Sequence, residues 1–172
     1  SLLELLDPAH LDPDFLRAVG NIRFRGATSI LLLGLDGLPE LPAPAGATFV
    51  VAPSIRFLER AYDGVKYGGS SDEPALEMTV PSFGSAGLAP AGKQVAVVRV
   101  QHTPYHLRTG DWSAERERIA ERALTGLDRV VPGLSSRVLH QAVLAPPDLE
   151  REFGLTEGAA SHGEMMLDQI LF

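Results

Sequence analysis

Hydrophobic residues recur along the chain in short runs, and the pattern of each run predicts one strand or one helix. The run from Ala27 to Leu35 is rich in Ile and Leu and has the length of a buried strand. Alternation of apolar and polar residues, or clusters of β-branched residues, mark further strands. These are expected at residues 48–52, 76–80, 94–101 and 138–144.

Four helices are predicted where apolar residues at helical spacing follow a capping residue. Asp12 caps the first helix, and Gly20 interrupts or closes it. Ser54 caps the second, which ends at the glycines that follow Tyr67. The other two are expected at about 114–131 and from 146 to near Gly154.

Strands that follow each other without an intervening helix are expected to pair antiparallel. This order of elements predicts an α+β domain, with a mixed, mostly antiparallel sheet and helices on one face. The length of 172 residues suits a single domain that spans residues 1–172. The chain starts without Met and ends on an apolar residue, so we expect a fragment of a larger protein.

Composition and charge exclude several classes of function. The net charge of −7 argues against nucleic-acid binding, and the absence of cysteine excludes thiolate metal sites and thiol catalysis. No apolar run has the ~20 residues of a membrane span, and no signal peptide is recognisable. We expect a cytoplasmic protein, or one of the mitochondrial matrix if the source is eukaryotic. An oligomer is compatible with the sequence.

Two motifs are better explained by structure than by chemistry. Residues 87–93 match the start of a phosphate-binding loop, but Gln94 stands where Ser or Thr would hold magnesium, and a strand follows. We therefore interpret this stretch as a turn. His102 and His106 are four residues apart, but Pro104 disfavours a helix there and no acidic residue completes a metal site. We predict no metal site.

Three other features carry charge or apolar surface near the ends of the chain. Arg23 and Arg25 alternate with apolar residues and are expected to lead into the first strand, with anion binding as the alternative. His162 and Glu164 would face one cavity if their segment is extended, and a solvated loop is the alternative. The apolar tail at 165–172 is expected to dock on this domain or on a missing part.

Several stretches, taken together and in register, resemble a known family. The resemblance covers about residues 11–172 and rests on residues 23–26, 35–39, 61–68, 88–93, 104–107, 147–158, 162–164 and 167–169. They resemble the phytoene-dehydrogenase-like (carotenoid-desaturase-like) branch of the FAD-dependent amine-oxidase superfamily. Members of that family are about three times as long and have Gly-rich FAD motifs before and after the matching region.

The resemblance implies that this chain is the substrate domain of an FAD-dependent oxidoreductase. The parent enzyme would oxidise or desaturate an apolar or amphipathic substrate by hydride transfer to flavin. It implies that His162 and Glu164 lie near the flavin or the domain junction, and it carries over no catalytic base. The fragment alone is expected to bind no FAD and to be inactive, and its partner would be the FAD-binding domain.

A second interpretation is a non-catalytic α+β module for binding or oligomerisation. Neither G-x-G-x-x-G nor G-x-S-x-G occurs in the chain, so nothing within it marks a dinucleotide site or a hydrolase nucleophile. A standalone hydrolase is therefore disfavoured.

Overall fold

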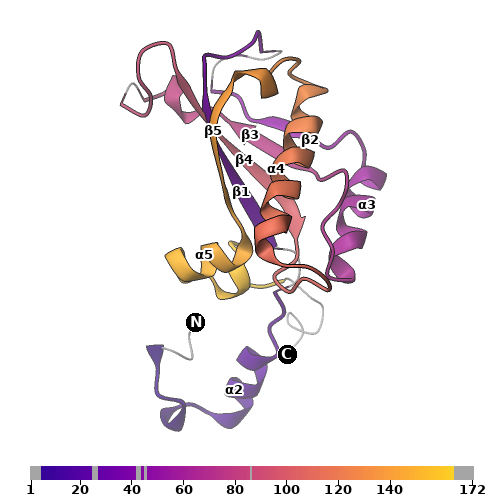
Figure 1. Ribbon diagram of the computed structural model, residues 1–172. Helices are drawn as coiled ribbons and strands as arrows, with labels where there is room; N and C mark the ends of the chain where they lie inside the picture. The colour runs from indigo at the N-terminus through magenta and orange to yellow at the C-terminus, as the bar shows by residue number, and fades with distance from the viewer. Residues whose placement is uncertain (1–4, 25–26, 42–43, 45, 86, 165–172) are drawn as a thin grey trace.

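The computed structural model describes residues 5–24, 27–41, 44, 46–85 and 87–164. Within them the predicted order of helices and strands is confirmed (Figure 1). The elements are α2 (Pro13–Gly20), β1 (Ala27–Leu35), β2 (Phe49–Val51), α3 (Ile55–Lys66), β3 (Leu76–Thr79), β4 (Gln94–Thr103), α4 (Trp112–Asp128), β5 (Val138–Leu144) and α5 (Pro146–Phe153). Short 3₁₀ turns are η1 (Pro8–His10), η2 (Pro81–Phe83), η3 (Ser135–Arg137) and η4 (Thr156–Gly158).

The five strands form one open sheet in the order β2-β3-β4-β1-β5, and every neighbouring pair is antiparallel. The α+β class is confirmed. The expected pairing of consecutive strands holds for β3 and β4 and is wrong for β1 and β2. The chain leaves β1, which lies between β4 and β5, and reaches β2 at the far edge.

One face of the sheet forms the hydrophobic core with α4. Burial alternates strictly along β1, where Leu31, Leu33 and Leu35 are buried and their neighbours are partly exposed. Ile119 and Leu127 of α4 belong to the same buried cluster. Full burial of one such side chain contributes about 1.5–3 kcal/mol, so this packing fixes which face of the sheet turns inward.

The helices begin where their capping residues predict. The Asp12 carboxylate accepts hydrogen bonds from the first turn of α2, and the Ser54 hydroxyl accepts one from the amide of Phe57. Both confirm the predicted caps. Asp111 caps α4, so that helix starts at Trp112, two residues earlier than expected. These side chains satisfy backbone N–H groups that the helix leaves without partners.

The helices are distributed unequally around the sheet. In Figure 1, α4 runs along the sheet with α3 beside it, and α5 lies at the end of β5. By contrast, α2 lies apart from the sheet and has no buried residue. Among the described residues, no helix has the length and hydropathy to cross a membrane.

Candidate functional site

The second face of the sheet carries an apolar strip. Ile30 and Leu32 on β1, with Val95 and Val97 on β4, point away from the core because they alternate with its buried residues. Leu32 lies directly opposite Val97. All four side chains are partly exposed in the described structure. We call this surface the open face, and these four residues its apolar strip.

A row of polar side chains crosses three strands at one end of the apolar strip. The Thr28 hydroxyl donates to Oε1 of Gln101 at 3.2 Å, and Nε2 of Gln101 donates to Oε1 of Glu77 at 3.1 Å. Nη1 of Arg99 lies 3.5 Å from Oε2 of Glu77. We call these four residues the polar row. They give the open face a hydrogen-bonding end and an apolar end.

A cavity of about 260 Å³ lies beside the polar row. Thr28, Arg99 and Gln101 form one side of it, and residues 159–161 form another. Arg99 is the one charged side chain among the described residues that line it. The cavity thus combines a cation with neutral hydrogen-bonding groups and small side chains.

The segments that lead into β1 and away from α5 lie side by side near this cavity. The amide of Glu164 donates to the carbonyl oxygen of Arg23 at 2.9 Å. A Cβ atom at Gly163 would lie 2.7 Å from Cγ2 of Ile22, so the two backbones approach closely. We call residues 22–24 the incoming segment and residues 162–164 the outgoing segment.

The structure places His162 at the surface in the left-handed region, with φ of 56°. Its amide donates to the carbonyl oxygen of Ala159. Glu164, in the outgoing segment, is joined to the incoming segment by the hydrogen bond from its amide to the carbonyl oxygen of Arg23. Their predicted place near a flavin or a domain junction stays a prediction. Arg25 and the apolar tail at 165–172 lie outside the described residues.

His102 and His106, the histidine pair of the sequence, pack against different tyrosine rings. His102, at φ 61°, packs edge-on against Tyr62 with ring centroids 5.2 Å apart. Burial lowers the pKa of His102. His106 packs against Tyr105 instead. Within the described residues no three His, Asp or Glu side chains are grouped so as to hold a metal ion.

The stretch that resembles a phosphate-binding loop ends in a turn that leads into β4, as predicted. Nζ of Lys93 lies 2.5 Å from Oδ1 of Asp36, and this hydrogen bond holds the pKa of Asp36 below its usual value. Asp36 follows β1, so the ion pair joins the neighbouring ends of β1 and β4. The lysine of the motif therefore has a structural partner.

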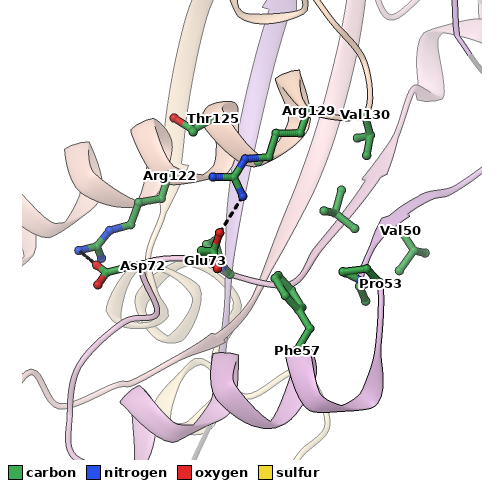
Figure 2. Close-up of a pocket in the computed structure, with 13 residues that line it drawn as sticks. Val50, Pro53, Phe57, Asp72, Glu73, Arg122, Thr125, Arg129 and Val130 are labelled. Atoms are coloured by element: carbon green, nitrogen blue, oxygen red, sulfur yellow. Dashed lines mark hydrogen bonds and ion pairs between the residues drawn. The ribbon is translucent and has the colours of Figure 1, made fainter.

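A second hollow of about 280 Å³ lies between α3, α4 and the loop before β3 (Figure 2). Val50, Val130 and Phe57 supply apolar surface. Two ion pairs close the polar side: Arg129 with Glu73 at 2.7 Å, and Arg122 with Asp72 at 2.6 Å. Each arginine has a carboxylate partner from the facing loop, which indicates a role in holding α4 against that loop.

The four members of the polar row are not recognisable as site residues in the sequence. Arg99 and Gln101 follow Val95 and Val97 at intervals of two, so the alternation of β4 does place them on one face. The alternation shows that these residues share a face of the sheet, but it does not show whether α4 covers that face. Glu77 and Thr28 join them through strand pairing, which the sequence does not display.

Curated proteins match this chain over its full length. No family model matches it. Over its whole length the chain resembles pyridine nucleotide-disulfide oxidoreductase domain-containing protein 2. The mouse protein is 29% identical and the rat protein 28% identical over 186 aligned positions. The match covers all of this chain and 32% of each relative.

The chain therefore spans about a third of the length of these curated relatives. This similarity agrees with the resemblance noted in the sequence, and the phytoene-dehydrogenase-like subtype stays a prediction. Among solved structures, the PF1083 protein from Pyrococcus furiosus aligns with 83% of this chain and 28% of its own, at 15% identity and a TM-score of 0.44.

Proposed function

We propose that this chain is the substrate-side domain of a longer flavin-dependent oxidoreductase. In this proposal the open face forms one wall of the substrate cavity, and the FAD-binding part of the protein covers it. The observation that carries the proposal is the partly exposed apolar strip on β1 and β4, neighbouring strands in the interior of the sheet. Apolar surface in the middle of a sheet normally packs against another layer or a ligand.

The resemblance to the rodent relatives supports an oxidoreductase role, because their name describes one. A disulfide reaction is not what this chain would contribute, since it contains no cysteine. Its contribution would be a shaped, dry surface. Such a wall orients the substrate and excludes water, which is the part of flavin chemistry that a protein supplies.

The described residues do not fit a binding site for the FAD pyrophosphate. Such a site needs a glycine-rich turn whose backbone N–H groups point at the phosphates from a helix N-terminus. The turn from β2 to α3 contains Pro53, and α5 begins with Pro146 and Pro147; none of these prolines has an N–H. The longer connection from β4 to α4 contains a single glycine, Gly110. The cofactor would therefore be held by the rest of the protein.

The closeness of the incoming and outgoing segments supports the proposal that this domain is inserted into a larger protein. An inserted domain needs its two connections close together, and Arg23 and Glu164 are joined by a backbone hydrogen bond. In this proposal His162 and Glu164 lie at the junction with the FAD-binding part. The substrate is apolar or amphipathic, because most of the wall is apolar and one end is polar.

The test is the visible absorption spectrum of two proteins, each mixed with excess FAD and desalted. We expect the 172-residue chain to emerge colourless and the full-length gene product that contains it to emerge yellow. A flavin spectrum on the short chain would show that the domain assignment is wrong. A colourless full-length protein would remove the flavin assignment and favour a non-catalytic binding or oligomerisation module.

A further inference from the structure

We propose that the cavity beside the polar row receives the carboxylate head group of a single-chain amphiphile, with Arg99 as its partner. The hydrocarbon tail would lie along the apolar strip. This inference rests on the proposed function, since it names the chemical class of ligand for the open face.

The first argument for an anionic head group is the charge of the cavity. Arg99 is the one charged residue among its described lining residues, and Glu77 is not among them. Thr28, Gln101 and Ser161 add neutral polar groups from both sides. A guanidinium group that shares a cavity with neutral polar groups is complementary to an anion, and its planar fork suits a carboxylate.

The contact between Arg99 and Glu77 leaves the guanidinium able to take a further partner. Their atoms are 3.5 Å apart, which is longer than the ~2.8 Å of a strong charge-assisted hydrogen bond. Half of the Arg99 side chain is exposed. Glu77 also accepts a hydrogen bond from Gln101 at 3.1 Å. A guanidinium has five N–H donors, so Arg99 can keep Glu77 and bind a second carboxylate.

The surface next to Arg99 explains why the ligand would carry a hydrocarbon tail. Ile30 lies directly opposite Arg99 on β1, and Val97 and Val95 follow on β4 at intervals of two residues. From Arg99 to Val95 the strand rises about 13 Å, at roughly 3.3 Å per residue. A head group at Arg99 therefore places a tail directly on the apolar strip.

The experiment follows backbone amide signals of the ¹⁵N-labelled chain by NMR during titration with two probes below their micellar concentrations. Decanoate and nonyltrimethylammonium have tails of the same length and head groups of opposite charge. We expect decanoate to shift the signals of Ile30, Val97 and Arg99 and to bind more tightly than the cationic probe. Acetate, which has no tail, should cause no such shifts at the same concentration.

Arg99→Gln tests the assigned partner. We expect it to weaken decanoate binding about tenfold, as loss of a charge-assisted hydrogen bond does, and to abolish the preference for the anionic probe. Arg118→Gln removes the same charge from an exposed position on α4 and should leave decanoate binding unchanged. Thermal unfolding of both variants reports whether they are folded.

Equal binding of both probes to the open face, unaffected by Arg99→Gln, would overturn the role of Arg99 and leave the open face as a substrate wall. Shifts confined to other surfaces, or none with either probe, would overturn the proposal altogether. The flavin spectrum of the full-length protein judges the proposed oxidoreductase function independently of either outcome.

Discussion

The backbone amide of Glu164 donates a hydrogen bond to the carbonyl oxygen of Arg23, across 141 positions of sequence (164 − 23). This bond joins the outgoing segment to the incoming segment. At Gly163, next to it, φ is 124° and a Cβ atom would lie 2.7 Å from Cγ2 of Ile22. The close pairing of the two segments therefore depends on glycine at this position.

Gly163→Ala should separate the two segments. The added methyl group meets Ile22, and alanine at this φ is strained, so we expect local opening to become easier by about 1–3 kcal/mol. Hydrogen exchange at the Glu164 amide measures the effect. Gly87→Ala is the matched control, because nothing lies within 4 Å of its added methyl group and its φ is not positive. Unchanged exchange in Gly163→Ala would contradict the close pairing.

Asp148 should make stability depend on pH. Burial alone would raise its pKa, but hydrogen bonds from Arg116 and from the Ala145 amide outweigh burial and hold the pKa below its ordinary value of 3.8. A carboxyl group whose pKa is lower in the folded state stabilises the protein above the unfolded-state pKa. That contribution is lost as pH falls through the folded-state value.

Asp148→Asn should therefore reduce the free energy of unfolding by about 2 kcal/mol at neutral pH, since it removes the negative charge facing Arg116. The difference from the parent chain should shrink as pH falls below 3.8, because the parent carboxyl becomes protonated too. Urea unfolding at a series of pH values measures both curves. A difference that stays constant with pH would show that the charge is not responsible.

Two glycines near α5 allow the cost of backbone strain to be measured apart from the cost of steric overlap. Gly158 and Gly154 have nearly the same φ, 67° and 68°. A Cβ atom at Gly158 would lie 2.5 Å from Cα and from the carbonyl oxygen of Pro146, whereas nothing lies within 4 Å at Gly154. The overlap at Gly158 is with backbone, which cannot move aside as a flexible side chain can.

We expect Gly154→Ala to cost about 1 kcal/mol of stability from its φ alone. Gly158→Ala should cost about 2 kcal/mol more, since the backbone must shift to make room. Equilibrium unfolding in urea measures both variants. Equal losses would mean that the turn at η4 does not lie against Pro146 as the structure places it.

The Tyr105 hydroxyl donates a hydrogen bond to the Glu150 carboxylate, which also accepts one from the Glu157 amide. The bond from Tyr105 is the main reason that the pKa of Glu150 lies below its ordinary value of 4.5. Tyr105→Phe should raise the pKa of Glu150 toward that value. Carboxyl-carbon NMR titration measures it, with Tyr67→Phe, at an exposed position, as the control. An unchanged pKa of Glu150 in Tyr105→Phe would contradict this hydrogen bond.

The elements of the fold could be predicted from local signals, because those signals act within a few residues. Asp12 and Ser54 cap helices at the positions that the sequence indicates. Burial alternates along β1 because one of its two faces packs into the core that it shares with α4. The order of the strands could not be predicted, since β1 pairs with β4 and β5 through contacts far apart in the sequence.

The candidate site shows the same division. His162 and Glu164 are recognisable as candidates because their imidazole and carboxylate groups stand close in the sequence. The polar row is not recognisable, because Thr28, Glu77 and Gln101 come together only through the register of three strands. A site that is assembled across a sheet leaves only the alternation within each strand as a signal in the sequence.

In the proposed function, the open face lines an enclosed cavity in the full-length protein. Because these 172 residues contain no cysteine, an introduced thiol is the one thiol among them, and mass spectrometry of the peptide that carries it reports its labelling in either protein. Val97→Cys places that thiol on the apolar strip, and Glu117→Cys places it on the exposed side of α4 as a control. We expect maleimide to label Val97→Cys readily in the 172-residue chain and far more slowly in the full-length protein, with Glu117→Cys labelled equally in both. Equal labelling of Val97→Cys in the two proteins would contradict the claim.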